Sequence, residues 1–351
     1  MQALTRTVPM LAVALSLFQP ALADSPLTKE LRHDTIQSLC KTLNERYVDA
    51  KAAKKIEAEL TKKEAEGLFD NQTSGEQFAK QIMEICHGLV TDAHLRMRYS
   101  EETLPVRKVA SEPSAAELAK YRDFVKFSNS SWTKVERLPG NIGYFAFNGF
   151  QEPADLNRPL KAAMDFLGET DAMIIDLRTN GGGSPAGVAA VCSYFFGDTP
   201  VHLNDISFRD GDKLIKNESW TAKKVDGKRY LDKEVYVLVS KRTGSGAEEC
   251  AYDLQCLKRA TIVGENTWGG ANPGGNVRLN DHFAVFVPVG RAENPYTHKN
   301  WEGTGVTPDI KADPKESLKI AQILALNFLI KKSTDADQKA SYEAALTELK
   351  K

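Results

Sequence analysis

The stretch Val235-Tyr-Val-Leu-Val-Ser-Lys-Arg-Thr-Gly-Ser-Gly-Ala-Glu-Glu-Cys-Ala-Tyr-Asp-Leu254 joins an apolar run to a helical pattern through a tight turn. Residues 235–239 are apolar and rich in valine, which is typical of a strand buried on both faces. From about Ala247 the apolar residues recur at helical spacing. Ser245, held between two glycines, is therefore predicted at a helix N-terminus. A serine there serves either as an N-cap or as a nucleophile whose oxyanion meets free backbone N–H groups.

The chain around this stretch alternates between strand and helix patterns. We expect strands at 142–147, 173–177, 261–263 and 283–287, and helices at 154–167, 186–196, 315–331 and 335–350. Residues 200–232, with turns at Asp210-Gly211 and Asp226-Gly227, are predicted to form an antiparallel excursion. Strands separated by helices indicate βαβ units and a largely parallel sheet, so the fold class is α/β.

The N-terminal third is organised differently. Residues 1–23 carry one charge, Arg6, then an apolar run and the small-residue site Ala21-Leu-Ala23, which together predict a signal peptide and an exported protein. The apolar run is short for a bilayer span, so we expect no stable membrane insertion after cleavage; an uncleaved anchor is the alternative. Residues 24–99 are predicted to be a helical module, residues 100–135 a linker, and residues 136–351 the α/β core.

Composition narrows the classes of partner. The net charge of −1 lacks the basic surplus of a nucleic-acid-binding protein, so we expect no nucleic acid partner. The five cysteines are too scattered for a disulfide framework, and no C-x-x-C pair suggests zinc; they are Cys40, Cys86, Cys192, Cys250 and Cys256. Cys40 and Cys86 fall on two helices of the same module, which makes them the expected bridge. The others fit small buried hydrophobic residues equally well.

A glycine-rich loop, Asn180-Gly-Gly-Gly183, follows one strand and opens a helix. Phosphate-binding loops are built in the same way, but the full G-x-G-x-x-G motif and the Walker lysine are missing. Glycines also let the backbone approach a substrate closely, so a free N–H of this loop could join the Gly246 N–H in an oxyanion hole. A plain tight turn is the simpler alternative.

A serine hydroxyl needs a base to take its proton. Five of the six histidines fall on predicted helices, strand edges or loops: His33, His87, His202, His282 and His298. His94 differs because Asp92-Ala-His94 lies where a helix gives way to a strand, a place that holds a side chain rigidly. A carboxylate must orient the histidine. Glu302 is one candidate, Glu248, Glu249 and Asp92 are rivals, and sequence spacing does not choose among them.

Four motifs occur in order: Asp176-Leu-Arg-x-Asn-Gly-Gly-Gly183, Thr243-x-Ser245-x-Ala-Glu248, Gly264-Glu-x-Thr-Trp-Gly-Gly270 and Glu302-Gly-x-Gly-Val-x-Pro-Asp309. Together they resemble the C-terminal processing peptidases, the S41 family of serine peptidases. The resemblance covers most of residues 140–312. It implies a ClpP/crotonase-like core with a mixed sheet and flanking helices, with Ser245 as the nucleophile. It also implies an oxyanion hole built from Gly182, Gly183 and Gly246.

The sequence departs from that family at the base. Processing peptidases typically carry a lysine in Thr-Phe-Gly-Lys-Gly, and the matching position here is Gly270. Residues 100–135 are also too few for a PDZ module. Both features resemble the branch that contains the tricorn core protease and the interphotoreceptor retinoid-binding protein. That resemblance implies a Ser245–His94–Glu302 triad.

The expected function is that of an exported serine peptidase, periplasmic or secreted, that hydrolyses peptide bonds of a peptide or protein substrate through an acyl-enzyme, with no cofactor or metal. The alternatives are a module that binds an apolar ligand, as in the retinoid-binding relatives, and a hydrolase of non-peptide esters or amides. An inactive scaffold is disfavoured by the intact motifs. The sequence leaves open the oligomeric state and whether loops 200–232 and 266–280 gate the site.

Overall fold

A central mixed sheet organises the chain in the computed structural model, which describes residues 27–106, 114–211 and 213–351. The strands of this sheet lie in the order β12 (Ile310–Lys311), β8 (Thr261–Gly264), β7 (Glu234–Val239), β4 (Ala172–Asp176), β3 (Ile142–Phe147) and β2 (Trp132–Leu138). Neighbouring strands from β12 to β3 run parallel, whereas β2 pairs with β3 antiparallel. The carboxyl ends of β4, β7 and β8 therefore lie at one edge of the sheet.

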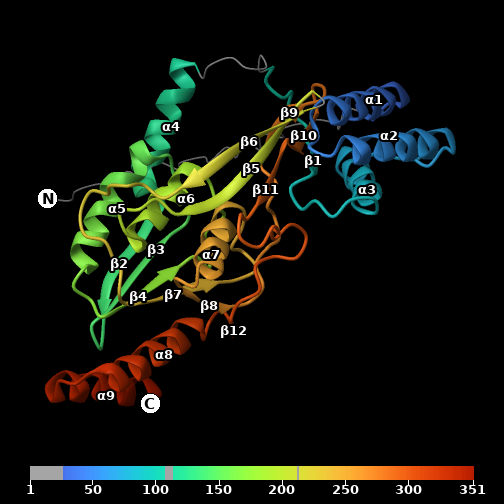
Figure 1. The fold of residues 1–351 in the computed structure, drawn as a ribbon. Coiled ribbons are helices and arrows are strands. Elements are labelled where there is room, and N and C mark those ends of the chain that lie inside the picture. The colour runs from blue at the N-terminus through green and yellow to red at the C-terminus, as the bar shows by residue number, and fades with distance from the viewer. Residues whose placement is uncertain (1–26, 107–113, 212) are drawn as a thin grey trace, which may run out of the picture.

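Both faces of this sheet are covered by helices, which explains the apolar strand sequences. Met173 and Ile175 of β4 belong to a core with α5 (Pro153–Leu167), α6 (Pro185–Cys192) and α7 (Gly246–Cys256). Ala172 and Ile174 alternate to the opposite face. There they pack with α8 (Ser317–Lys332) and α9 (Ala336–Lys350), which lie together below the sheet in Figure 1.

The N-terminal helices have a separate hydrophobic core. These helices are α1 (Lys29–Arg46), α2 (Ala50–Ala65) and α3 (Gly75–His87). They pack on a second sheet of order β1 (Arg96–Tyr99), β10 (Phe283–Pro288) and β9 (Gly274–Arg278). Because β1 pairs with β10, a segment from late in the chain completes the core of the N-terminal helices. Figure 1 shows this assembly at one end of the molecule.

A third sheet joins the two regions. It has the order β11 (Gly290–Glu293), β5 (His202–Asp210) and β6 (Lys213–Trp220), all antiparallel. Strand β11 begins two residues after β10 ends, so one backbone runs from the second sheet into the third. In Figure 1 the β5–β6 ribbon extends from the core toward the N-terminal helices.

The predicted α/β class with a mixed sheet is confirmed. The antiparallel excursion is present as β5 and β6, and helix α4 (Ala115–Phe127) lies inside the segment predicted as a linker. Strand β2 was not predicted, because Trp132–Leu138 carries polar residues at the open edge of the sheet. Short 3₁₀ turns at Asn129–Ser131 and Ser193–Phe195 complete the elements.

Two predictions concern the cysteines and the leader. In the structure all five cysteines are free thiols, so the expected Cys40–Cys86 bridge is absent; both side chains are buried in the core of the N-terminal helices. An unpredicted pair, Cys192 and Cys250, has its sulfur atoms 3.9 Å apart between α6 and α7. The predicted signal peptide lies outside the described residues. Within the described ranges, no helix has the length and apolar character needed to cross a membrane.

Candidate active site

Three loops meet at the carboxyl edge of the central sheet. The loop 177–184 follows β4, the turn 240–245 follows β7, and the loop 265–273 follows β8. Because β4, β7 and β8 are adjacent parallel strands, these loops are neighbours in space, where α/β proteins commonly place their sites. Backbone hydrogen bonds tie them together: Gly244 N–H donates to Asn180 O, and Trp268 N–H donates to Thr243 O.

Ser245 occupies the turn between β7 and α7 in a strained conformation. Its φ is 52° and its ψ is −123°, a region that residues with a side chain rarely adopt. Such an outlier survives only where the surroundings enforce it, and it clusters at functional sites. A sharp strand-to-helix turn of this kind exposes a nucleophilic serine in other hydrolases. Ser245 is the N-cap residue of α7, and the Glu248 side chain accepts its backbone N–H in the manner of a capping box.

Glu248 is the group that enforces this turn. Its buried carboxylate accepts the Ser245 N–H at 2.8 Å and the Gly269 and Gly270 N–H groups at 2.6 and 2.9 Å. It also accepts the Thr267 hydroxyl at 2.5 Å. Burial raises the pKa of Glu248 to about 7 against the opposing effect of these donors. Glu248, a rival orienting carboxylate in the sequence, therefore joins the nucleophile turn to the loop after β8.

The glycine-rich loop packs directly against Ser245. A Cβ added at Gly182, whose φ is +95°, would lie 2.7 Å from Ser245 Cβ and 2.6 Å from Gly246 N, so only glycine fits. The Gly182 N–H donates to Asn180 Oδ1 at 2.9 Å. The Gly182 N–H was expected to be an oxyanion donor, but it already donates a hydrogen bond to Asn180 and is not free for that role. Among the described residues, no acceptor binds the N–H groups of Gly183 and Gly246, and these remain as oxyanion donors.

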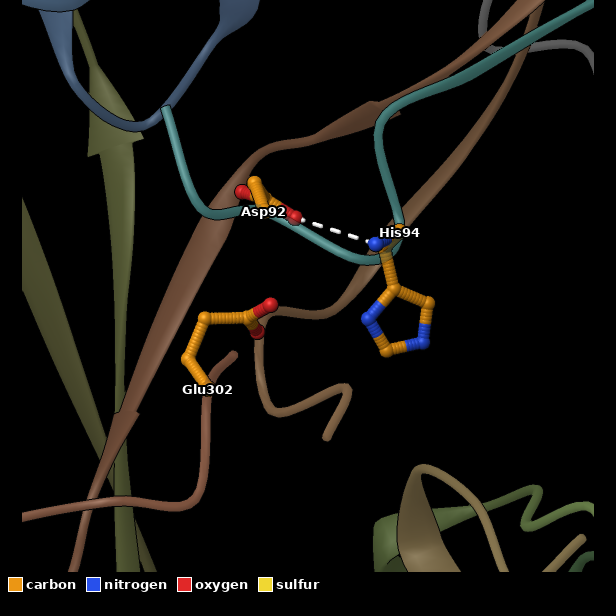
Figure 2. Close-up of side chains that lie close together, drawn as sticks. All are labelled: Asp92, His94 and Glu302. Atoms are coloured by element: carbon orange, nitrogen blue, oxygen red, sulfur yellow. Dashed lines mark hydrogen bonds between the residues drawn. The ribbon is translucent and has the colours of Figure 1, made fainter. Parts of the chain in front are cut away.

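His94 reaches the site from the segment between α3 and β1. Its ring packs edge-on to Trp268 with 4.7 Å between centroids and stacks on Phe286 of β10 at 5.5 Å. The Asp92 carboxylate accepts the His94 backbone N–H at 3.1 Å. The Nδ1 atom is buried and has no hydrogen-bond partner among the described residues. In Figure 2 one ring nitrogen faces the side on which Glu302 lies, and the other points away from it.

Glu302 and Asp92 lie beside that ring. One nitrogen of His94 and one oxygen of each carboxyl group lie within 4.8 Å of one another (Figure 2). Glu302 accepts backbone N–H groups of Ala93, Ala271 and Asn272 at 2.6 to 2.9 Å. No hydrogen bond joins His94 to Glu302 or to Ser245 within the described residues. The arrangement brings the predicted residues together in a relaxed form, as is common before substrate binds.

Asp92 is bound mainly to structural partners. Its carboxylate accepts the Tyr47 hydroxyl at 3.1 Å and the Asn272 side-chain amide at 3.0 Å. Together with His94 and Glu302 it forms a set of donor atoms that could in principle hold a metal ion. However, the oxygens of both carboxyl groups already accept protein hydrogen bonds. The arrangement therefore fits a histidine held between hydrogen-bonded carboxylates better than a metal site.

Burial sets the charge of these groups. It lowers the pKa of His94 to about 4, with a further contribution from the positive charge of Arg96, so the imidazole is neutral at pH 7. Burial raises the pKa of Glu302, and the neighbouring charge of Asp92 raises it further. A neutral imidazole can accept a proton, which is what a general base requires.

Ser245 and His94 line the same cavity, which has a volume of about 240 Å³. Its other walls come from both regions of the molecule and comprise Gly183, Pro185, Ile206, Gly246, Glu249, Ala271, Pro273, Gly274, Phe286 and Trp301. The two free donors of Gly183 and Gly246 are therefore on the wall next to the serine. A carbonyl group placed in this cavity would meet nucleophile, donors and base together.

The space in front of Gly270 is filled by the candidate base. A Cβ added at Gly270 would lie 2.6 Å from His94 Cε1 and 2.3 Å from Trp268 Cζ3. A lysine at this position, as the resemblance to processing peptidases implies for those proteins, would collide with both rings. The position of the His94 ring is thus compatible with glycine at position 270 and not with a lysine there.

The remaining histidines lie elsewhere. Three of them contact carboxylates: His33 contacts Glu64, His202 contacts Asp205, and His298 contacts Glu293. The other two contact backbone carbonyl groups: His87 that of Leu95, and His282 that of Ser100. The sequence analysis missed Trp268 and Tyr47, which pack and hydrogen-bond around the His94 segment. The Trp268 position was visible in a quoted motif, but nothing in the sequence indicated which ring it would face.

Residues 141–312 match the sequence model of Peptidase family S41. The chain is 28% identical over 235 residues to "Carboxyl-terminal-processing peptidase 2, chloroplastic" of Arabidopsis thaliana, covering 63% of this chain and 42% of that protein. It is 29% identical over 224 residues to a carboxyl-terminal-processing protease of Synechocystis sp., covering 62% of this chain and 49% of that protein. The chain thus aligns with about half or less of the length of these relatives.

Among solved structures, mature CPAF superposes with a TM-score of 0.53 at 11% identity, covering 91% of this chain and 96% of that one. This similarity shows the fold alone. The family match falls on the segment that contains all strands of the central sheet except β2, together with the glycine-rich loop, Ser245 and Glu302. Residues 141–312, just under half of the chain, are thus identified by their similarity to peptidase family S41.

Proposed function

We propose that this chain is an exported serine peptidase that hydrolyses peptide or protein substrates through an acyl-enzyme on Ser245. One observation carries the proposal. Ser245 is held at a positive φ beside the free N–H groups of Gly183 and Gly246, in a cavity that His94 also lines. Nucleophile, oxyanion donors and base are the parts that acyl transfer needs.

The mechanism uses each part in turn. His94 takes the Ser245 proton while the oxygen attacks the substrate carbonyl carbon, and the Gly183 and Gly246 N–H groups stabilise the tetrahedral oxyanion. His94 then protonates the leaving amine, and the acyl-enzyme remains. Water, deprotonated by His94, attacks the ester carbonyl and releases the acid and the free serine. A neutral His94 at pH 7 supports the first step.

Glu302 is the proposed orienting carboxylate. It lies beside the His94 ring, and its pKa is raised, so a hydrogen bond from Nδ1–H to this group would relieve a buried unpaired nitrogen and stabilise the imidazolium that forms. Asp92 is proposed as a positioning residue, because it binds the His94 backbone N–H. Closure of the gap between His94, Glu302 and Ser245 on substrate binding completes the triad.

Reaction of the purified chain with a fluorophosphonate probe tests the proposal. We expect mass spectrometry to find the adduct at Ser245, none in Ser245→Ala, and a labelling rate lower by at least ~100-fold in His94→Ala. Glu302→Gln should lie between the wild type and His94→Ala. A folded protein that is not labelled at Ser245 would overturn the proposed function, and unchanged labelling of His94→Ala would overturn the choice of base.

Export rests on the N-terminal residues alone. The same mass spectra, taken on protein recovered after expression with its own N-terminus, should give a chain that begins at Asp24. Retention of residues 1–23 would overturn cleavage at Ala23.

A ligand-binding role is less well supported by the geometry. The cavity of about 240 Å³ is below the ~300–1,000 Å³ usual for pockets that enclose small-molecule ligands. Hydrolysis of a non-peptide ester or amide would use the same residues, and a comparison of ester and peptide substrates distinguishes it.

A further inference from the structure

A carboxyl group forms part of the cavity wall beside the nucleophile. Glu249 lies on the first turn of α7, four residues after Ser245, which precedes the helix as its N-cap residue. Its side chain is 4% exposed and lines the same cavity as Ser245, Gly183 and His94. Its Oε1 atom is buried with no hydrogen-bond partner among the described residues.

The contrast with the preceding residue is informative. Glu248 accepts four hydrogen bonds from the surrounding loops, so this part of the protein can satisfy a buried carboxylate fully. Glu249 has no comparable set. A buried polar atom without a partner is costly, by about 1–3 kcal/mol for an ordinary group and more for a charged one. Because Glu249 lines the cavity and has an unsatisfied carboxyl oxygen, a ligand in the cavity is expected to pair with this carboxyl group.

The charges around Glu249 favour a cation as that ligand. Asp253 is one helical turn further on, is fully buried, and has its own unpaired oxygen. Among the described residues, no lysine or arginine forms an ion pair with either carboxyl group. Burial raises the pKa of Glu249 to about 7, and the Asn204 amide is the group that opposes this effect. A cation brought by a substrate would supply the missing charge.

The other walls fit the stem of a long side chain. Ile206, Phe286 and Trp301 are apolar and line the cavity. Its volume of about 240 Å³ equals roughly eight waters of ~30 Å³ each, which accommodates the five non-hydrogen atoms of a lysine side chain. Lysine and arginine bury an alkyl stem along apolar surface while the charged end seeks a polar partner.

We propose that Glu249 selects substrates with a lysine or arginine as the residue whose carbonyl Ser245 attacks. This inference rests on the proposed function, because it takes the cavity beside the Gly183 and Gly246 donors as the pocket for that residue. The alkyl stem of the substrate side chain lies along Ile206 and Trp301, and its cationic end pairs with the Glu249 carboxylate. No residue of the chain then needs to neutralise this buried group.

A matched set of peptides tests the proposal. The peptides are identical except at the residue before the cleaved bond, which is lysine, its neutral analogue norleucine, or glutamate. In the wild-type protein we expect kcat/KM for the lysine peptide to exceed that for the norleucine peptide by on the order of 10²-fold, since a desolvated ion pair is at stake. In Glu249→Gln the ratio of the two kcat/KM values should fall below ~5-fold, because the lysine peptide loses its charged partner.

Asp253→Asn is the control for general disturbance of α7. It changes a buried carboxyl group on the same helix that does not line the cavity, so the lysine preference should fall much less than in Glu249→Gln. Equal cleavage of lysine and norleucine peptides by the wild type would overturn the proposal. Persistence of the preference in Glu249→Gln would do the same.

Binding separates this proposal from the proposed function. Calorimetric titration of Ser245→Ala with the two peptides should show tighter binding of the lysine peptide, and Ser245→Ala/Glu249→Gln should lose the difference. If the wild type neither reacts with fluorophosphonate nor cleaves peptides, the proposed function fails, yet this titration still decides the role of Glu249. Equal affinity of both peptides for Ser245→Ala would refute it.

Discussion

The nucleophile side of the cavity, which contains Ser245 as the proposed nucleophile, and the base side, which contains His94 as the proposed base, are built in different ways. Ser245 and the glycine-rich loop belong to neighbouring strands of one sheet. Glu248 links the Ser245 turn to the loop after β8, because it accepts one hydrogen bond from Ser245 and three from that loop. His94 lies in a short segment between α3 and β1, whose place depends on the separate core of α1, α2, α3 and β10. One side is fixed by hydrogen bonds within a sheet, and the other by packing of a second core.

This difference explains why Ser245 and His94 line one cavity while, among the described residues, no hydrogen bond joins them. The Ser245 turn is strained and held by the Glu248 carboxylate, whereas His94 Nδ1 lacks a partner among the described residues and the ring is held mainly by aromatic contacts. Packing contacts tolerate small shifts better than a set of short hydrogen bonds does. We therefore expect the base, rather than the nucleophile, to adjust when substrate binds.

Removing the Glu248 carboxylate should have the largest effect on stability and labelling, because its hydrogen bonds hold the nucleophile side together. Glu248→Ala leaves four donors without their acceptor, so the free energy of unfolding should fall by about 3–5 kcal/mol, and fluorophosphonate labelling of Ser245 should be lost. Urea denaturation and labelling at a temperature where the variant is folded measure the two effects. Glu248→Gln, which keeps an acceptor oxygen, should lie in between. Wild-type stability of Glu248→Ala would contradict this account of the turn.

Truncating a side chain in the core of the N-terminal helices should affect the base side of the cavity and not the nucleophile side. Phe78 of α3 is fully buried and its ring contacts Phe69 and Phe283 at centroid distances of 5.5 and 5.8 Å. Phe78→Ala should lower the free energy of unfolding by about 3–4 kcal/mol and also slow Ser245 labelling per folded molecule, because the support of His94 loosens.

The matched control is Leu326→Ala, which opens a cavity under α8 on the far face of the central sheet. We expect a loss of about 3 kcal/mol with an unchanged labelling rate per folded molecule. Equal slowing by both truncations would mean that the base side is not independently supported.

The pH dependence of stability should show a smaller effect of His94 itself. Its pKa of about 4 in the folded protein is below the ordinary value of 6.5, so the unfolded chain binds the proton first as the pH falls. The stabilising contribution is complete above pH 6.5 and is lost between pH 6.5 and pH 4, by up to about 3 kcal/mol at 1.36 kcal/mol per unit.

His94→Gln isolates this contribution from the carboxyl groups, whose raised pKa values act in the opposite direction. Denaturation of both proteins at pH 7, 5.5 and 4 should give stabilities that converge toward the acid end. Parallel curves would indicate that His94 titrates in the folded protein as it does in the unfolded chain.

Much of the nucleophile side could be predicted from the sequence. The β7–Ser245–α7 unit is continuous in the chain, so local patterns of apolar residues and glycines describe it. The glycine-rich loop was expected beside it from the close approach that glycines allow and from the family resemblance, and the parallel pairing of β4 with β7 accounts for this position. The sequence did not show that the Gly182 N–H is unavailable as an oxyanion donor, because this depends on its hydrogen bond to the Asn180 side chain.

The base side could be predicted only through family resemblance. His94 and Glu302 are 208 residues apart in the chain, and no periodicity relates them. Their meeting depends on β1 pairing with β10, a long-range contact that local patterns do not encode. The Cys40–Cys86 bridge was inferred from shared location alone, and co-location of two cysteines in a core does not supply the geometry of a disulfide.

The glycine at position 270 has a consequence for how such a site can change. The His94 and Trp268 rings fill the volume that a side chain at position 270 would enter. A histidine at position 94 and a lysine at position 270 therefore cannot occupy this volume together. Gly270→Lys alone would push against the ring of His94, the proposed base. A change from one arrangement to the other would therefore involve two segments that are distant in the sequence.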